Sequence, residues 1–135
     1  MKRTTWLFSL CLALSAYADP VAEAWEDANV AMKRGDFQQA VDVWLPLAEK
    51  GCAGSQIQLE NIFEENIALA KTNLQAVYFF EKIAKYHDST KLLLARISLA
   101  ENDQENAKYW LEQILDSEFD SYKVQAEAHL SMLNQ

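Results

Sequence analysis

The chain has 135 residues, with 20 acidic and 12 basic side chains and a formal net charge of −8, and half of its residues are hydrophobic. This length fits one domain with a sizeable core, and the acidic surface argues against nucleic acid or anionic lipid as a partner. Three glycines and two prolines interrupt a sequence rich in Ala, Leu, Glu, Gln and Lys. Since no β-branched runs alternate with polar residues, the composition predicts helices and disfavours a β-rich fold.

The N-terminal segment has the pattern of an export signal. Lys2 and Arg3 precede an apolar stretch over residues 6–14, and small residues lie at the two positions that a signal peptidase reads, Ala16 and Ala18. The stretch is shorter than the roughly 20 residues that a membrane-spanning helix needs. We therefore predict a bacterial signal peptide over residues 1–18, cleaved after Ala18, a mature domain over residues 19–135, and a periplasmic or secreted location.

Cleavage at this point would change both the charge and the cysteine content. The mature chain would lose Lys2 and Arg3 but no acid, which leaves 20 acidic and 10 basic residues and a net charge of −10. It would also lose Cys11, so Cys52 would be the one cysteine of the mature chain. A cysteine of this kind is usually buried as a small apolar residue, and a bond between two chains is the alternative.

Seven helices are expected along the mature chain. Their approximate ranges are 21–33, 37–50, 55–65, 74–86, 90–100, 103–115 and 121–133. Gly35 is expected to end the first in a left-handed conformation, and Asp36 to cap the second. Pro46 inside the second predicts a kink or an early end near Leu45, because proline removes one helical hydrogen bond.

The later helices have candidate caps of their own. These are Asn73 or Thr72, Ser89 or Asp88, Asp103, and Ser121. The connections between the helices are short, apart from a loop over about 66–73. Short connections predict that sequential helices pack as antiparallel neighbours.

Three segments align on an alanine that is followed by aromatic or large apolar residues. They begin at Ala40, Ala76 and Ala107, with offsets of 36 and 31 residues, which lie in the range of helical-hairpin repeats. The small residue lets two helix backbones approach, while the side chain one turn later covers the same face. The pattern therefore predicts packing between helices.

The aligned residues also carry a family resemblance. One set resembles a tetratricopeptide repeat: Ala24, Trp25, Ala28, Ala31, Gly35, Asp36, Phe37, Ala40 and Trp44. A second set resembles the Sel1-like variant: Gln56, Leu59, Phe63, Ala76, Phe79, Phe80, Ile83 and Ala84. A third, shorter unit includes Leu94, Ala95, Ile97, Ala107, Trp110 and Leu115. The resemblance implies an all-α fold, a right-handed α-α superhelix (solenoid) of about three helical hairpins with a C-terminal capping helix around Ala126 and Leu130.

Residues suited to catalysis or metal binding are sparse. His87 and His129 have no acidic or cysteine neighbour at a ligand spacing, and Cys52 with His87 is the only conceivable nucleophile–base pair. No glycine-rich phosphate loop occurs, and the carboxylates at Asp116, Glu118 and Asp120 lack the spacing of a calcium loop. We expect no enzymatic activity, no metal and no cofactor, and interpret the acidic residues as a solvated rim that attracts a basic surface.

The aromatic residues are expected either to pack in the core or to contact a partner. Trp44, Phe79, Phe80, Trp110 and Tyr109 stand at packing positions, so most of them are expected in the core. Trp25 and Tyr122 are less constrained by the repeat register. Either one would anchor a partner if it faced a groove.

In this architecture the first helix of each hairpin lines the groove. The candidate lining residues are Asn29, Met32, Lys33, Gln58, Asn61, Glu65, Lys91 and Arg96. A mixed polar lining suits a protein or peptide partner, so the leading expectation is an exported protein-binding module, monomeric or weakly dimeric. Two alternatives are a periplasmic immunity or inhibitor protein that neutralises a basic toxin, and a Sel1-like hydrolase.

Overall fold

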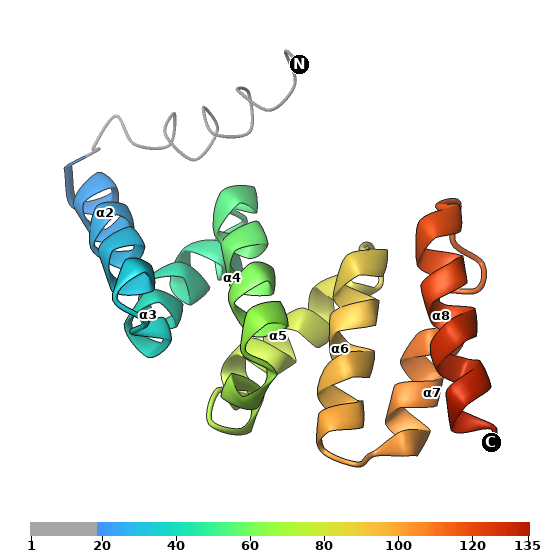
Figure 1. The fold of residues 1–135 in the computed structure, drawn as a ribbon. Coiled ribbons are helices and arrows are strands. Elements are labelled where there is room, and N and C mark those ends of the chain that lie inside the picture. Colours follow the sequence, from blue (N-terminus) through green and yellow to red (C-terminus); the bar gives the residue numbers. More distant parts are fainter. Residues whose placement is uncertain (1–18) are drawn as a thin grey trace. The chain divides into compact units, whose positions relative to one another are not determined.

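The computed structural model describes residues 19–135, so the predicted signal peptide and its cleavage site lie outside the described residues. Contacts divide the chain into two units, of which the first ends at Ile62 and the second is Phe63–Gln135. All regular secondary structure in the described part is helical, and no strand is present there (Figure 1). It consists of α2 (Asp19–Lys33), α3 (Phe37–Glu49), α4 (Ala53–Glu65), the 3-10 helix η1 (Ile67–Lys71), α5 (Leu74–Ala84), α6 (Asp88–Ala100), α7 (Gln104–Glu112) and α8 (Asp120–Leu133).

The expected all-α fold, built from successive helices that pack on each other, is confirmed. Each of the seven predicted helices is present, with ends within about three residues of the expected ones. The predicted loop over 66–73 contains η1. The sixth predicted helix ends three residues early, at Glu112, and tight turns follow it.

The first unit is built on the α2–α3 hairpin. Gly35 has φ 76°, and the Asp36 and Gly35 amides donate to the carbonyls of Ala31 and Met32 at 2.9 and 3.0 Å, which closes α2. The Asp36 carboxylate accepts from the Gln39 amide at 3.2 Å and caps α3 as predicted. This turn brings Trp25 and Trp44 together, with ring centroids 5.6 Å apart.

Helix α3 passes through Pro46, so the predicted early end near Leu45 is wrong. The carbonyl that loses its helical donor belongs to Asp42, and both Asp42 and Pro46 are exposed, so water can satisfy that carbonyl. Val41, Trp44 and Leu45 before the proline and Ala48 after it are buried. Packing on both sides of Pro46 therefore keeps the helix continuous.

Cys52 follows α3, at the start of α4. Its side chain is half-buried, so the full burial expected from the sequence is not reached. The other cysteine, Cys11, lies outside the described residues.

The second unit is organised around α6, which packs against α5, α7 and α8. Asn102 ends α6 with φ 61°, and the amides of Asp103 and Asn102 donate to Ser98 and Leu99 at 2.9 and 3.1 Å. The Asp103 carboxylate accepts from the Asn106 amide at 3.0 Å and caps α7 as predicted. Asn is the residue that most often replaces glycine in this left-handed position.

The expected alanine positions are confirmed as packing sites. Ala40, Ala76 and Ala107 are each fully buried, and Phe80, which follows Ala76 by one turn, packs edge-on against Phe63 at 5.1 Å. Among the predicted core aromatics, Tyr109 is 52% exposed and Trp110 is half-buried against the C-terminal core. The C-terminal core joins Leu92, Ala95, Leu111, Ile114 and Ala126, and half-buried Tyr122 packs against it.

Candidate functional site

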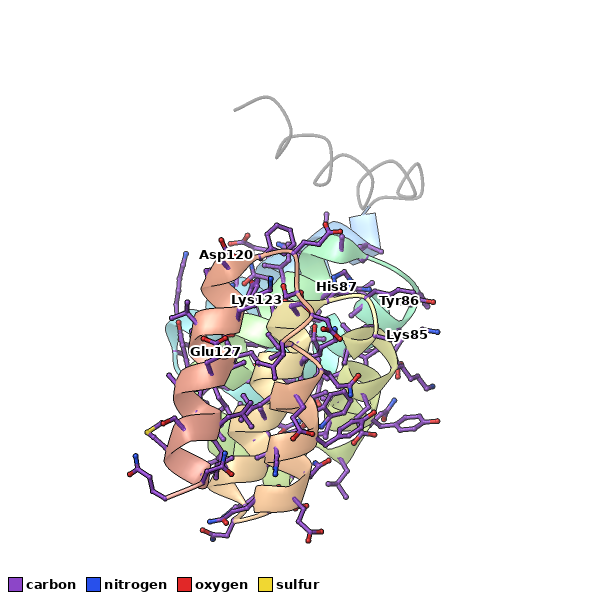
Figure 2. The ribbon with its side chains drawn as sticks, turned by 90° about the vertical axis from the view of Figure 1, so that its right-hand side faces the viewer. Lys85, Tyr86, His87, Asp120, Lys123 and Glu127 are labelled. Carbon is purple, nitrogen blue, oxygen red and sulfur yellow. The ribbon has the colours of Figure 1, made fainter. Side chains whose placement is uncertain are left out.

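A pocket of about 280 Å³ opens in the second unit, where the α5–α6 turn faces the α7–α8 loop. Its lining residues are Lys85, Tyr86, Asp88, Lys91, Gln113, Asp116, Ser117, Glu118 and Phe119. Figure 2 shows Tyr86 and His87 at the same end of this unit as Asp120 and Lys123 in the first turn of α8. Two loops that are distant in sequence therefore form one surface feature.

Asp88 connects the two sides of the pocket. One carboxylate oxygen accepts from Lys91 Nζ at 2.8 Å, and the other accepts from Ser117 Oγ at 2.6 Å, a hydrogen bond that spans 29 residues. Ser117 Oγ also accepts from the Phe119 amide at 3.0 Å. The Asp88 side chain thus fixes the α7–α8 loop to the first turn of α6, where a negative charge is also favoured by the helix dipole.

The same contacts set the acidity of Asp88. Partial burial raises the pKa of the Asp88 carboxyl, but the hydrogen bonds from Lys91 and Ser117 and the charge of Lys91 lower it by more. The net result is a pKa below the ordinary value of 3.8. Asp88 is therefore ionised at neutral pH, and its ion pair with Lys91 is largely shielded, with side-chain exposures of 17% and 16%.

Two large aromatic side chains stand at the mouth of the pocket. Tyr86 is 72% exposed and Phe119 is 63% exposed. Lys85 Nζ lies 4.6 Å from the centroid of the Tyr86 ring, and Phe119 touches Tyr122 edge-on at 6.3 Å. The pocket therefore combines two exposed aromatic rings with a charged base.

The predicted groove residues are divided between the two units. Asn29, Met32, Lys33, Gln58 and Asn61 belong to the first unit, and Glu65, Lys91 and Arg96 to the second. Lys91 alone among the eight lines the pocket, while Arg96 Nη2 donates to the Glu64 carbonyl at 3.3 Å. Whether the eight residues form a groove stays a prediction.

Sequence reasoning missed Asp88, Ser117, Tyr86 and Phe119 as neighbours. Asp88 was expected as a helix cap, yet α6 begins at Asp88 with His87 in the cap position, and the side chain bonds to a distant serine instead. The one usable signal was Phe119, an aromatic residue set among loop carboxylates. The two residues expected as possible anchors, Trp25 and Tyr122, are half-buried and pack inside their own units.

Residues 19–135 contain no group of three or more His, Cys, Asp and Glu side chains placed to hold a metal ion, and no helix among them is long and apolar enough to cross a membrane. The chain matches no protein-family model, no curated protein and no solved structure.

Proposed function

We propose that this chain is an exported helical-repeat protein, of the kind that tetratricopeptide and Sel1-like repeats form, and that it binds a protein or peptide partner. The observation that carries the proposal is the pocket of the second unit, whose rim exposes Tyr86 and Phe119. Large aromatic side chains are enriched at the centres of protein interfaces, where they contribute a disproportionate share of binding energy. Successive helix pairs supply a rigid support for such a surface.

The pocket is better suited to recognition than to bond-making. Asp88 accepts two hydrogen bonds and Lys91 is paired with it, so their main contribution is to hold the loop in place. A base with a raised pKa next to a nucleophile would favour catalysis, whereas the pKa of Asp88 is lowered by its hydrogen bonds from Lys91 and Ser117 and by the charge of Lys91. These contacts support the proposal that the pocket binds a partner.

Site-directed photocrosslinking tests this proposal. A photoreactive amino acid is placed at Tyr86 in the full-length chain, expressed in its native host, and Lys50 in the first unit serves as the control position. We expect one distinct adduct from Tyr86, identified by mass spectrometry, and direct binding when the purified pair is titrated by calorimetry. Adducts that are absent from Tyr86, or equally abundant from Lys50, would contradict the proposal.

A narrower second function is inhibition of a basic toxin in the periplasm. The feature in its favour is the last part of the chain, since residues 101–135 hold eight acidic and two basic side chains. Such a surface accelerates association with a cationic protein. Survival of cells that export a toxic partner together with this chain, compared with cells that lack it, distinguishes inhibition from simple binding.

A further inference from the structure

The pocket has a preorganised base. Asp88, Lys91 and Ser117 are joined by hydrogen bonds of 2.8 and 2.6 Å, and Ser117 is buried with only 6% of its surface exposed. The Phe119 amide is bonded to the same serine at 3.0 Å, which fixes the backbone that carries the exposed ring. A partner that enters this pocket meets a rim that is already ordered, so less conformational entropy is lost on binding.

The charges at the rim are not balanced. Within residues 19–135, neither Asp116 nor Glu118 forms an ion pair, whereas Asp88 and Lys91 neutralise each other at the base. Lys85 is the one remaining cation of the lining, and its ammonium group lies over the Tyr86 ring. The acidic side of the pocket therefore has carboxylates available for a cation from outside.

We propose that this pocket binds the guanidinium group of an arginine in a basic segment of the partner protein, between Tyr86 and Phe119 and against the carboxylates of Asp116 and Glu118. This inference rests on the proposed binding function and specifies the chemistry of the partner. Guanidinium is planar, stacks on aromatic faces and pairs with carboxylates through two parallel hydrogen bonds. Lysine offers a point charge without the planar face, so it fits the two rings less well.

Two features of the pocket disfavour other occupants. An anionic group would meet Asp116 and Glu118 at the rim, while the Lys91 ammonium is already engaged by Asp88. A volume of about 280 Å³ is at the small end of the range, roughly 300 to 1,000 Å³, of sites that hold small-molecule ligands. One side chain with its flanking backbone is the better match.

Nuclear magnetic resonance titration of the protein, expressed from its full-length reading frame, tests the inference. The probes are heptapeptides that are identical except for the central residue, which is arginine, lysine, glutamate or citrulline, the uncharged isostere of arginine. We expect the arginine peptide to shift the amide signals of residues 85–91 and 113–119 with weak affinity, on the order of 1 mM, and to bind about tenfold more tightly than the citrulline peptide.

Three variants of the pocket are expected to change the affinity for the arginine peptide, two of them weakening it and one tightening it. Asp116→Asn combined with Glu118→Gln, and separately Phe119→Ala, are each expected to weaken binding of the arginine peptide by about tenfold. Lys85→Ala is expected to tighten it by about threefold, because a competing cation leaves the Tyr86 ring. Tighter binding cannot arise from misfolding, so this variant keeps the test informative even where another variant loses structure.

Matched controls exist in the same unit. Glu101→Gln combined with Glu105→Gln removes the same charge from exposed acids outside the pocket lining, and Lys82→Ala removes the lysine that lies 4.2 Å above the exposed Tyr78 ring. Both are expected to change the affinity by less than about twofold. Equal binding of arginine and citrulline peptides, or equal effects of pocket and control variants, would overturn the inference. The proposed function would then still be judged by the crosslinked partner.

Discussion

The short turns between helix pairs and the α7–α8 loop are held by different kinds of contact. The α2–α3 and α6–α7 turns share one arrangement, a left-handed residue followed by an aspartate, and their hydrogen bonds join residues at most five positions apart. The α7–α8 loop is fixed instead by Ser117 and Asp88, which lie 29 positions apart. The helix–turn–helix connections are therefore specified by residues that are close in sequence. The pocket, in contrast, forms only after the helices that carry Asp88 and Ser117 have packed together.

The largest effect is expected where the hairpins need close helix contact. Ala40→Leu and Ala107→Leu each insert a larger side chain at a fully buried position, and overpacking of this kind costs about 2 to 3 kcal/mol. Urea unfolding followed by circular dichroism measures the loss. Ala128→Leu, on an exposed face of α8, is the control and is expected to change stability by less than about 0.5 kcal/mol. Equal effects at the three positions would show that the alanine register does not set the packing.

The long-range hydrogen bond between Ser117 and Asp88 is tested by the variant Asp88→Asn. The change removes the charge that Lys91 faces and weakens the bond to Ser117, and we expect a loss of about 1 to 3 kcal/mol at pH 7. Because the folded pKa of Asp88 lies below its ordinary value of 3.8, its stabilisation is present above that pH and is lost as the pH falls through the folded pKa.

Urea unfolding between pH 7 and pH 2 checks the pH dependence. The difference in free energy of unfolding between the natural chain and Asp88→Asn should become smaller once the pH falls below about 4. Asp116→Asn, which alters an exposed carboxylate beside the same serine, serves as the control and should leave stability nearly unchanged at every pH. A gap of constant size would show that the charge of Asp88 contributes nothing.

A smaller effect distinguishes the two left-handed turn residues. A Cβ at Gly35 meets no atom within 4 Å, so Gly35→Ala loses only the backbone preference, about 1 to 2 kcal/mol. Asn102→Gly, in the equivalent turn, relieves mild backbone strain but also raises the conformational entropy of the unfolded chain. Because the two effects oppose each other, we expect the free energy of unfolding to change by less than about 0.5 kcal/mol. Thermal unfolding of both variants compares them. A larger loss for Asn102→Gly than for Gly35→Ala would mean that the Asn102 side chain has a role of its own.

The smallest effect is expected at the two matched caps. Asp36→Ala and Asp103→Ala each remove a carboxylate that accepts one backbone amide, at 3.2 and 3.0 Å, and each should cost about 1 kcal/mol. Asp36→Asn and Asp103→Asn keep an acceptor and should restore most of the loss. Unequal costs for the two alanine variants, measured by urea unfolding, would show that the turns are not equivalent.

The sequence by itself determined the helical frame. The helices, the caps at Asp36 and Asp103, the left-handed Gly35 and the buried alanines at 40, 76 and 107 were all predictable, because each depends on residues within a turn or two of one another. Helix periodicity and turn chemistry act over those distances, so a linear pattern records them.

Only the tertiary structure decided the pocket. From the sequence, Asp88 is expected to cap a helix and Ser117 to lie in a loop. Nothing in their spacing of 29 positions indicates that the two side chains form a hydrogen bond. The same holds for Tyr109, which has the register of a core residue but lies exposed, and for Pro46, which α3 tolerates because the packing around it is favourable. The physical reason is that these outcomes depend on which neighbour covers each helix face, and that neighbour comes from elsewhere in the chain.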